Sequence, residues 1–156
     1  MKITDPYSPT IEPSAFTTTI GNPYFLLTPG TRTIYEAATK DGLQRTVDTA
    51  GSFEGGVDGA MPGIIMPGHP QIGDQYRQEY AKGVAEDTGE VLSLSGSETT
   101  PLTGPAKDLL VTKDADLLDS TAPGENKYYA RGVGLILTVT TTDPAERDQA
   151  IVVEKF

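Results

Sequence analysis

The sequence predicts an all-β protein, in the form of a curved antiparallel sheet or an incomplete β-barrel. Runs rich in β-branched and aromatic residues alternate in polarity with a period of two, as half-buried strands do. Glycines and prolines, 17 and 12 among 156 residues, separate these runs with turns. A chain of this length is one ordinary domain. We therefore expect a single β domain, with residues 1–30 as an extended arm and residues 31–156 as the sheet body.

The predicted arm contains prolines at positions 6, 9, 13, 23 and 29. Each proline disfavours the helical conformation for the residue before it, so the arm should lie extended across the domain. Within the arm, Asn22–Leu27 forms an apolar plug, and Thr28–Gly30 forms a turn into the first strand.

The predicted strands begin at Thr31, from which polarity alternates through Glu36. Further strands are expected at residues 75–82, 84–95, 109–112, 126–130, 135–142 and 150–154. Turns are expected at residues 40–42, 96–97 and 132–134. Helix candidates are single turns at residues 13–18, 105–110 and 144–148.

A loop rich in glycine and proline is predicted between Gly51 and Gly73. Glycine is flexible and proline has no amide hydrogen to donate, so a segment this rich in both cannot form a regular helix or a central strand. Tertiary contacts should therefore hold this segment as a shaped loop, and loops of this kind often carry function.

The composition excludes several classes of function. A net charge of −10 and a pI near 4.4 disfavour nucleic acid and anionic membranes as partners, because both are bound mainly through Lys and Arg. The absence of cysteine excludes disulfides, thiol nucleophiles and thiolate metal sites. No run approaches the roughly 20 apolar residues of a transmembrane segment, and the first residues lack the apolar run of a signal peptide.

Three segments together resemble a family of uncharacterised exported bacterial β-proteins that are often predicted lipoproteins. They are Asn22–Ala37 (NPYFLLTPGTRTIYEA), Thr49–Leu94, which contains GSFEGGVDGAMPGIIMP, and Lys127–Thr138 (KYYARGVGLILT). The resemblance implies an extracytoplasmic protein, secreted, periplasmic or lipid-anchored. Because the family has no assigned biochemical role, the resemblance transfers no catalytic residue.

The sequence departs from this family in two places. Members usually carry a signal peptide, which is missing here. They also carry a run with several strands between the positions that correspond to Arg45 and Val47. The join at Gln44–Val47 therefore resembles an internal deletion.

Two tyrosine-rich strands suggest a surface that could bind a ligand. Aromatic rings offer contact area, and interspersed Arg and Glu side chains can orient a polar group. The sheet face would then hold a small amphipathic ligand or a peptide, whereas the alternative is a structural sheet face with cross-strand ion pairs. The candidate ligand-binding residues are Tyr76, Arg77, Glu79, Tyr80, Tyr128, Tyr129 and Arg131.

A metal site is the competing hypothesis. Met61, Met66 and His69 lie close together in the glycine-rich loop, and thioethers with imidazole suit Cu(I). The structural alternative places both methionines in the core and the histidine in a turn.

A calcium loop fits the sequence poorly. Asp114, Asp116, Asp119 and Glu125 occupy a window that lacks the glycine an EF-hand loop needs at its sixth position. A solvated acidic turn explains these carboxylates better.

The sequence contains no nucleophile motif, phosphate loop or dinucleotide-binding signature. It therefore indicates no catalytic residue and no cofactor. We expect a non-enzymatic exported protein with a binding or structural role.

Overall fold

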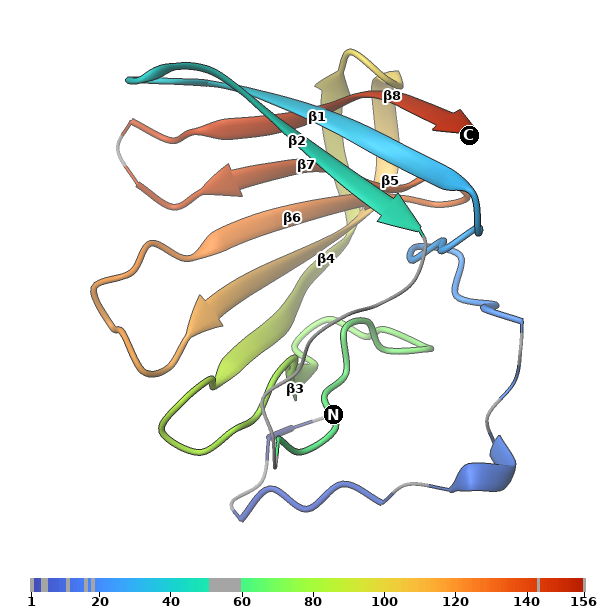
Figure 1. Cartoon of the computed structure of the whole chain (residues 1–156), viewed down its shortest axis with the longest axis vertical. Coiled ribbons are helices and arrows are strands. Elements are labelled where there is room, and N and C mark those ends of the chain that lie inside the picture. The colour runs from blue at the N-terminus through green and yellow to red at the C-terminus, as the bar shows by residue number, and fades with distance from the viewer. Residues whose placement is uncertain are drawn as a thin grey trace.

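The structure is a computed structural model that describes residues 2–3, 6–10, 12–15, 17, 19–50, 60–142 and 144–155. These residues form one antiparallel sheet of eight strands and a single short 3₁₀ turn at Pro13–Ala15 (Figure 1). The strands are β1 (Thr31–Thr39), β2 (Gly42–Ala50), β3 (Gln75–Arg77), β4 (Asp87–Thr100), β5 (Gly104–Asp116), β6 (Glu125–Ala130), β7 (Gly134–Thr140) and β8 (Arg147–Lys155).

The sheet is curved and open. Its strand order is β2-β1-β8-β7-β6-β5-β4-β3, and the end strands β2 and β3 do not pair with each other. All neighbours are antiparallel, and β1 joins the C-terminal strand β8 although the two are far apart in sequence. The predicted all-β class, with a curved antiparallel sheet that does not close into a barrel, is confirmed.

The strand register defines two faces of the sheet. One row of directly opposed residues runs across six strands, and its side chains lie on one face, which we call the trough face. The opposite face is called the hairpin face. The row consists of Thr112, Lys127, Thr138, Asp148, Ala37 and Gln44.

The β4–β5 hairpin covers part of the hairpin face. Its strands are interrupted by register shifts that bend it, and its tip lies behind the sheet in Figure 1. The Leu102 amide donates to the Ala150 carbonyl at 3.1 Å, which fixes the tip against β8. Beneath the hairpin lies a core of Leu109, Ala130, Ile136 and Leu137.

A second core lies on the trough face, at the β3–β6 end of the sheet. It consists of Met66, Tyr76, Val91, Leu110 and Tyr129, with Tyr24, Phe25, Ile64 and Leu135 packed against it. The arm and the described part of the glycine-rich loop thus cover this end of the face.

Backbone contacts hold both covering segments in place. The Ile64 amide donates to the Arg77 carbonyl at 2.7 Å, beside β3. A Cβ at Gly63 would overlap the Gln78 carbonyl oxygen, so glycine is required for this approach. The Gly132 amide donates to the Pro23 carbonyl at 2.8 Å and anchors the arm. Residues 51–59 of the predicted loop lie outside the described residues.

Several predicted elements were wrong. The turn expected at residues 96–97 lies inside β4, and the helical turn expected at residues 105–110 belongs to β5. Residues 144–148 form no helix, because β8 begins at Arg147. At Gly96 a Cβ would lie 2.5 Å from Val111 Cγ2, so this glycine permits the bulged pairing of the hairpin instead of ending the strand.

Gly89 provides a test of the trough-face core. The Tyr76 ring lies over this glycine, and a Cβ there would be 2.5 Å from Cε2 and 2.6 Å from Oη of Tyr76. We expect Gly89→Ala to lower the free energy of unfolding by about 1–3 kcal/mol, because the buried ring has no space to move away. Gly21→Ala is the matched control, since nothing lies within 4 Å of its Cβ. Urea denaturation would contradict the packing if both variants were equally stable.

Candidate functional site

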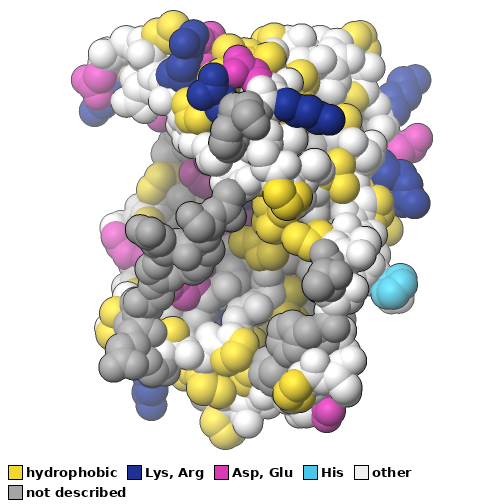
Figure 2. Space-filling view, turned by 45° about the vertical axis from the view of Figure 1, so that its right-hand side comes forward, with side chains coloured by type: hydrophobic (Ala, Val, Ile, Leu, Met, Phe, Trp, Pro, Cys, Tyr) yellow, Lys and Arg dark blue, Asp and Glu magenta, His cyan; other side chains and the backbone are white. Residues whose placement is uncertain are grey.

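The part of the trough face that the arm and loop leave uncovered forms a continuous hollow, which we call the trough. Its central cavity has a volume of about 530 Å³, and an adjoining cavity at the end we call the acidic end has about 250 Å³. Tyr35, Asp48 and Leu135 line both cavities. A third cavity of about 580 Å³ shares Leu26, Thr31, Thr33 and Val133 with the central one. Figure 2 looks into this side of the molecule, where hydrophobic side chains gather in the hollow.

The central cavity has apolar walls that are exposed to solvent. Side chains from the arm, the loop and the β6–β7 turn meet here. Each is between 40% and 49% exposed. Single exposed apolar side chains are common on protein surfaces, whereas a contiguous exposed group of them usually marks a binding site. The exposed side chains here are Leu26, Leu27, Ile65 and Val133.

Tyr35 forms the partition between the two ends of the trough. It is 5% exposed, and its hydroxyl donates to the Leu135 carbonyl at 3.2 Å. Burial raises the pKa of Tyr35, and the Asp48 carboxylate raises it further. The phenol therefore stays protonated and keeps its hydrogen bond at any physiological pH.

Carboxylates gather at the acidic end. Asp48, Glu125, Glu146 and Asp148 line this cavity together with the hydroxyls of Thr46, Thr138 and Thr140. Burial raises the pKa of Asp148, and the negative charges of Asp48 and Glu125 raise it further. Within the described part of the chain, no Lys or Arg lies within 4.0 Å of the Asp48, Glu146 or Asp148 carboxylate.

The cation on this part of the sheet is already paired. Lys127 Nζ lies 2.7 Å from Asp114 Oδ2 and 3.7 Å from Glu125 Oε2. Burial disfavours the charge of Lys127, but these two carboxylates outweigh it and raise its pKa. Asp114 also accepts hydrogen bonds from Gln78 Nε2 at 3.0 Å and Thr112 Oγ1 at 3.2 Å. Asp114 is therefore a buried, fully bonded carboxylate on β5, and the prediction that it belongs to a solvated turn was wrong.

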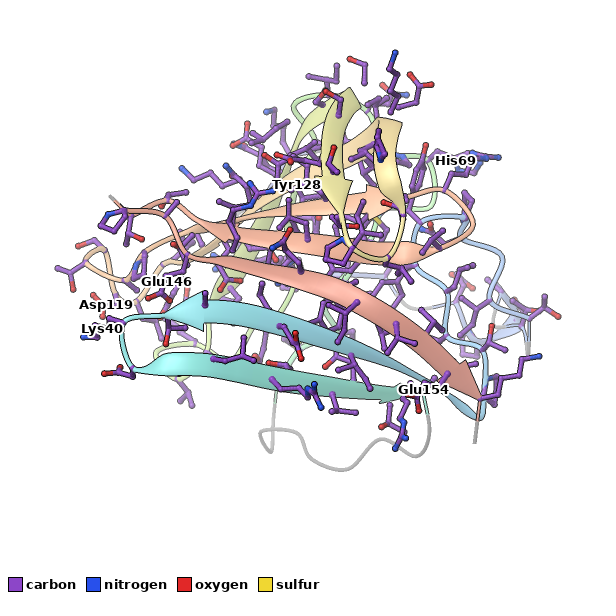
Figure 3. All side chains as sticks on the ribbon, turned by 90° about the horizontal axis from the view of Figure 1, so that it is seen from above. Lys40, His69, Asp119, Tyr128, Glu146 and Glu154 are labelled. Carbon is purple, nitrogen blue, oxygen red and sulfur yellow. The ribbon has the colours of Figure 1, made fainter. Side chains whose placement is uncertain are left out.

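The predicted tyrosine residues do not form one surface. Tyr76 and Tyr129 lie on the trough face and are 2% and 4% exposed, beneath the covering segments. Tyr128 lies on the hairpin face beside the β4–β5 hairpin, where it contacts the second core (Figure 3). Of the three, Tyr129 lines the central cavity.

The charged members of the predicted site pair locally. Arg77 lies 3.1 Å from Glu86 Oε2 and stacks over the Tyr80 ring at 4.7 Å, and Tyr80 makes an edge contact with Tyr7. Arg131 lies 5.9 Å from the Tyr24 ring, at the other side of the covered region. The Glu79 amide donates to the Asp87 carbonyl at 3.4 Å. These groups hold the β3 region and the arm in place.

The three candidate metal ligands have different environments. Met66 is buried in the trough-face core, whereas Met61 is 39% exposed and pairs through its amide with the Tyr80 carbonyl. His69 is exposed and lies at the edge of the molecule (Figures 2 and 3). No group of three or more His, Asp or Glu side chains among the described residues is arranged to hold a metal ion.

Four residues of the trough escaped sequence analysis: Tyr35, Asp48, Leu135 and Asp148. The signal for Asp48 was present, because Gln44, Thr46 and Asp48 alternate with apolar or long side chains along β2. The bend in the sheet that brings β2 opposite β6 depends on long-range pairing, which alternation does not reveal.

No helix among the described residues is long and apolar enough to cross a membrane. No protein-family model matches the sequence, and neither curated proteins nor solved structures gave a significant match. The trough is therefore interpreted from its own geometry.

The Lys127–Asp114 pair should be essential to the sheet beneath the trough. We expect Lys127→Met to lower the free energy of unfolding by about 2–3 kcal/mol, because it leaves the buried Asp114 carboxylate without its cation. Lys113→Met is the matched control, since Lys113 is the exposed neighbour on β5. Equal urea midpoints for the two variants would show that the pair contributes nothing.

Proposed function

We propose that the protein is a non-enzymatic, exported binding protein that holds a small amphipathic molecule in the trough. The observation that carries this proposal is the trough, in which a central cavity of about 530 Å³ with exposed apolar walls adjoins a smaller cavity with polar walls. Export is the part of the proposal that rests on the sequence resemblance.

The size of the cavities favours a small ligand over a folded partner. Pockets for small molecules usually have volumes of about 300–1,000 Å³ and apolar walls with a few polar groups. The central cavity falls in this range. Among the residues first predicted to bind the ligand, Tyr129 is the one that lies in its wall.

The exposed apolar side chains explain why a ligand would bind. Leu26 and Leu27 of the arm lie 40% and 45% exposed beside Ile65 of the loop, which is 49% exposed. A bound alkyl or aromatic group would remove this surface from water. Each buried methylene contributes about 0.8 kcal/mol, so a decyl chain would bind with a Kd on the order of 1–100 μM once association costs are subtracted.

A calorimetric titration with three decyl amphiphiles tests the proposal. Decylamine, decanol and decanoate share one tail, and each is used below its micellar concentration. We expect at least one of them to bind with one-to-one stoichiometry. If none binds, the trough is not a binding site for amphipathic molecules.

A plug variant locates the binding. Thr33 lines the central cavity from β1, so Thr33→Trp should fill the cavity and weaken binding of the tail at least about tenfold. Ala38→Trp is the matched control, because Ala38 is exposed on the other face of the same strand. Equal weakening by both substitutions would place the ligand elsewhere. The chain has no other tryptophan, so the fluorescence of each variant also reports its local environment.

A further inference from the structure

The trough runs lengthwise along β1. Alternate residues of this strand point to the trough face, and they line the three cavities in chain order. Ala37 and Thr39 line the acidic end, and Tyr35 lies at its boundary with the central cavity. Thr31 and Thr33 line both the central and the third cavity. A rod-shaped ligand would therefore lie parallel to the strands.

The third cavity, which we call the tip cavity, extends the central one to the tip of the β4–β5 hairpin. Leu102 and Thr103 of the tip line it, and so does Val153 of β8, which is paired with Thr33. The wall at the tip is fixed, because Leu102 packs against the second core and its amide donates to a carbonyl of β8. The tip cavity is thus a shaped continuation of the trough.

The number of charged lining residues falls from the acidic end to the tip. The acidic end has four carboxylates. The central cavity has Asp48, which also lines the acidic end, and Lys127, which is paired with Asp114. Among the described residues, no Lys, Arg, Asp or Glu lines the tip cavity. The part of a ligand that reaches the tip should therefore be uncharged, because a buried charge without a partner is costly.

The length of the apolar part of the trough matches one lipid tail. The four residue steps from Tyr35 to Thr31 span about 14 Å, at about 3.4 Å for each step. One tail fills half of the roughly 30 Å hydrocarbon core of a bilayer. A tail that starts beside Tyr35 would therefore reach Thr31 and enter the tip cavity.

We propose that the trough takes a single-chain lipid, whose unbranched hydrocarbon chain lies along β1 with its methyl end in the tip cavity. This inference rests on the proposed function and names its ligand class. The chain would cover Leu26 and Val133, which line both cavities, and Val153 at the tip, all of which are exposed. Removal of this apolar surface from water supplies the driving force.

A chain-length series separates this inference from the proposed function. The head group of the decyl amphiphile that binds most tightly, whether amine, alcohol or carboxylate, is kept, and its dodecyl and tetradecyl homologues are titrated below their solubility limits. Each two-carbon extension should tighten binding at least about fivefold, because the added methylenes are buried in the tip cavity. If the longer homologues bind no more tightly than the decyl compound, the inference is overturned while the trough remains a binding site. If no decyl compound binds, both proposals fail.

A substitution at the tip locates the end of the chain. Val153 lines the tip cavity but not the central one. Val153→Trp should therefore weaken tetradecyl binding at least about tenfold and leave decyl binding within about twofold. Leu43→Trp is the matched control, because Leu43 is an exposed apolar residue outside all three cavities. Equal effects of the two substitutions on tetradecyl binding would place the end of the chain elsewhere.

Val153→Trp should fold, because Val153 is 44% exposed. Val153→Glu provides a second variant, which places a charge against the end of the chain instead of filling the space. It should also weaken tetradecyl binding at least about tenfold. Unchanged tetradecyl affinity in both variants would show that the tip cavity takes no part in binding, and would overturn the inference.

Discussion

The packing of the loop segment around Met66 onto Tyr76 and Tyr129 is the interaction on which the rest of the structure depends. An open sheet exposes two faces, and a protein of this size has few residues to cover them. Here the chain covers one end of the trough face with this segment and the arm. The hairpin face is covered by the bent β4–β5 hairpin. What remains uncovered becomes the trough.

The open edges of the sheet are protected in two ways, by the covering loop at β3 and by charged side chains at β2. The β3 edge receives the Ile64 amide at the Arg77 carbonyl, so the covering loop also occupies this edge. The β2 edge stays exposed, but it carries Arg45, paired with Glu36, and the unpaired Asp48. Charged side chains on an edge strand discourage pairing with another chain. Asp48 therefore serves both the solubility of the edge and the polarity of the trough.

Local sequence patterns predicted the strands whose residues alternate clearly in polarity. They failed where pairing with another strand determined the structure. The alternation in β1 identified that strand, and the glycines at positions 132 and 134 identified the hairpin turn between β6 and β7. Pro105 suggested a helical turn, but it lies inside β5, where it pairs with Thr99 of β4. The pairing that places Asp148 and Lys127 in one row, on either side of Thr138, joins three strands, and no local pattern encodes its register.

The candidate site shows the same limit at the level of side chains. Adjacent residues in a strand point to opposite faces, so Tyr128 and Tyr129 could not both line one surface. Local sequence indicated that tyrosines and carboxylates were abundant, but the register determined which of them meet. Lys127 and Asp114 illustrate this, because they lie on neighbouring strands and pair only in the observed register.

Thiol labelling of single-cysteine variants tests most directly whether half of the trough face is covered and half is open, since the chain has no cysteine of its own. Thr112 and Thr138 flank Lys127 in one row, but Thr112 is fully buried beneath the cover and Thr138 lines the acidic end. We expect Thr138→Cys to react with a thiol reagent at least about a hundredfold faster than Thr112→Cys, because the cysteine at position 112 becomes accessible only on local unfolding. Equal rates would contradict this arrangement.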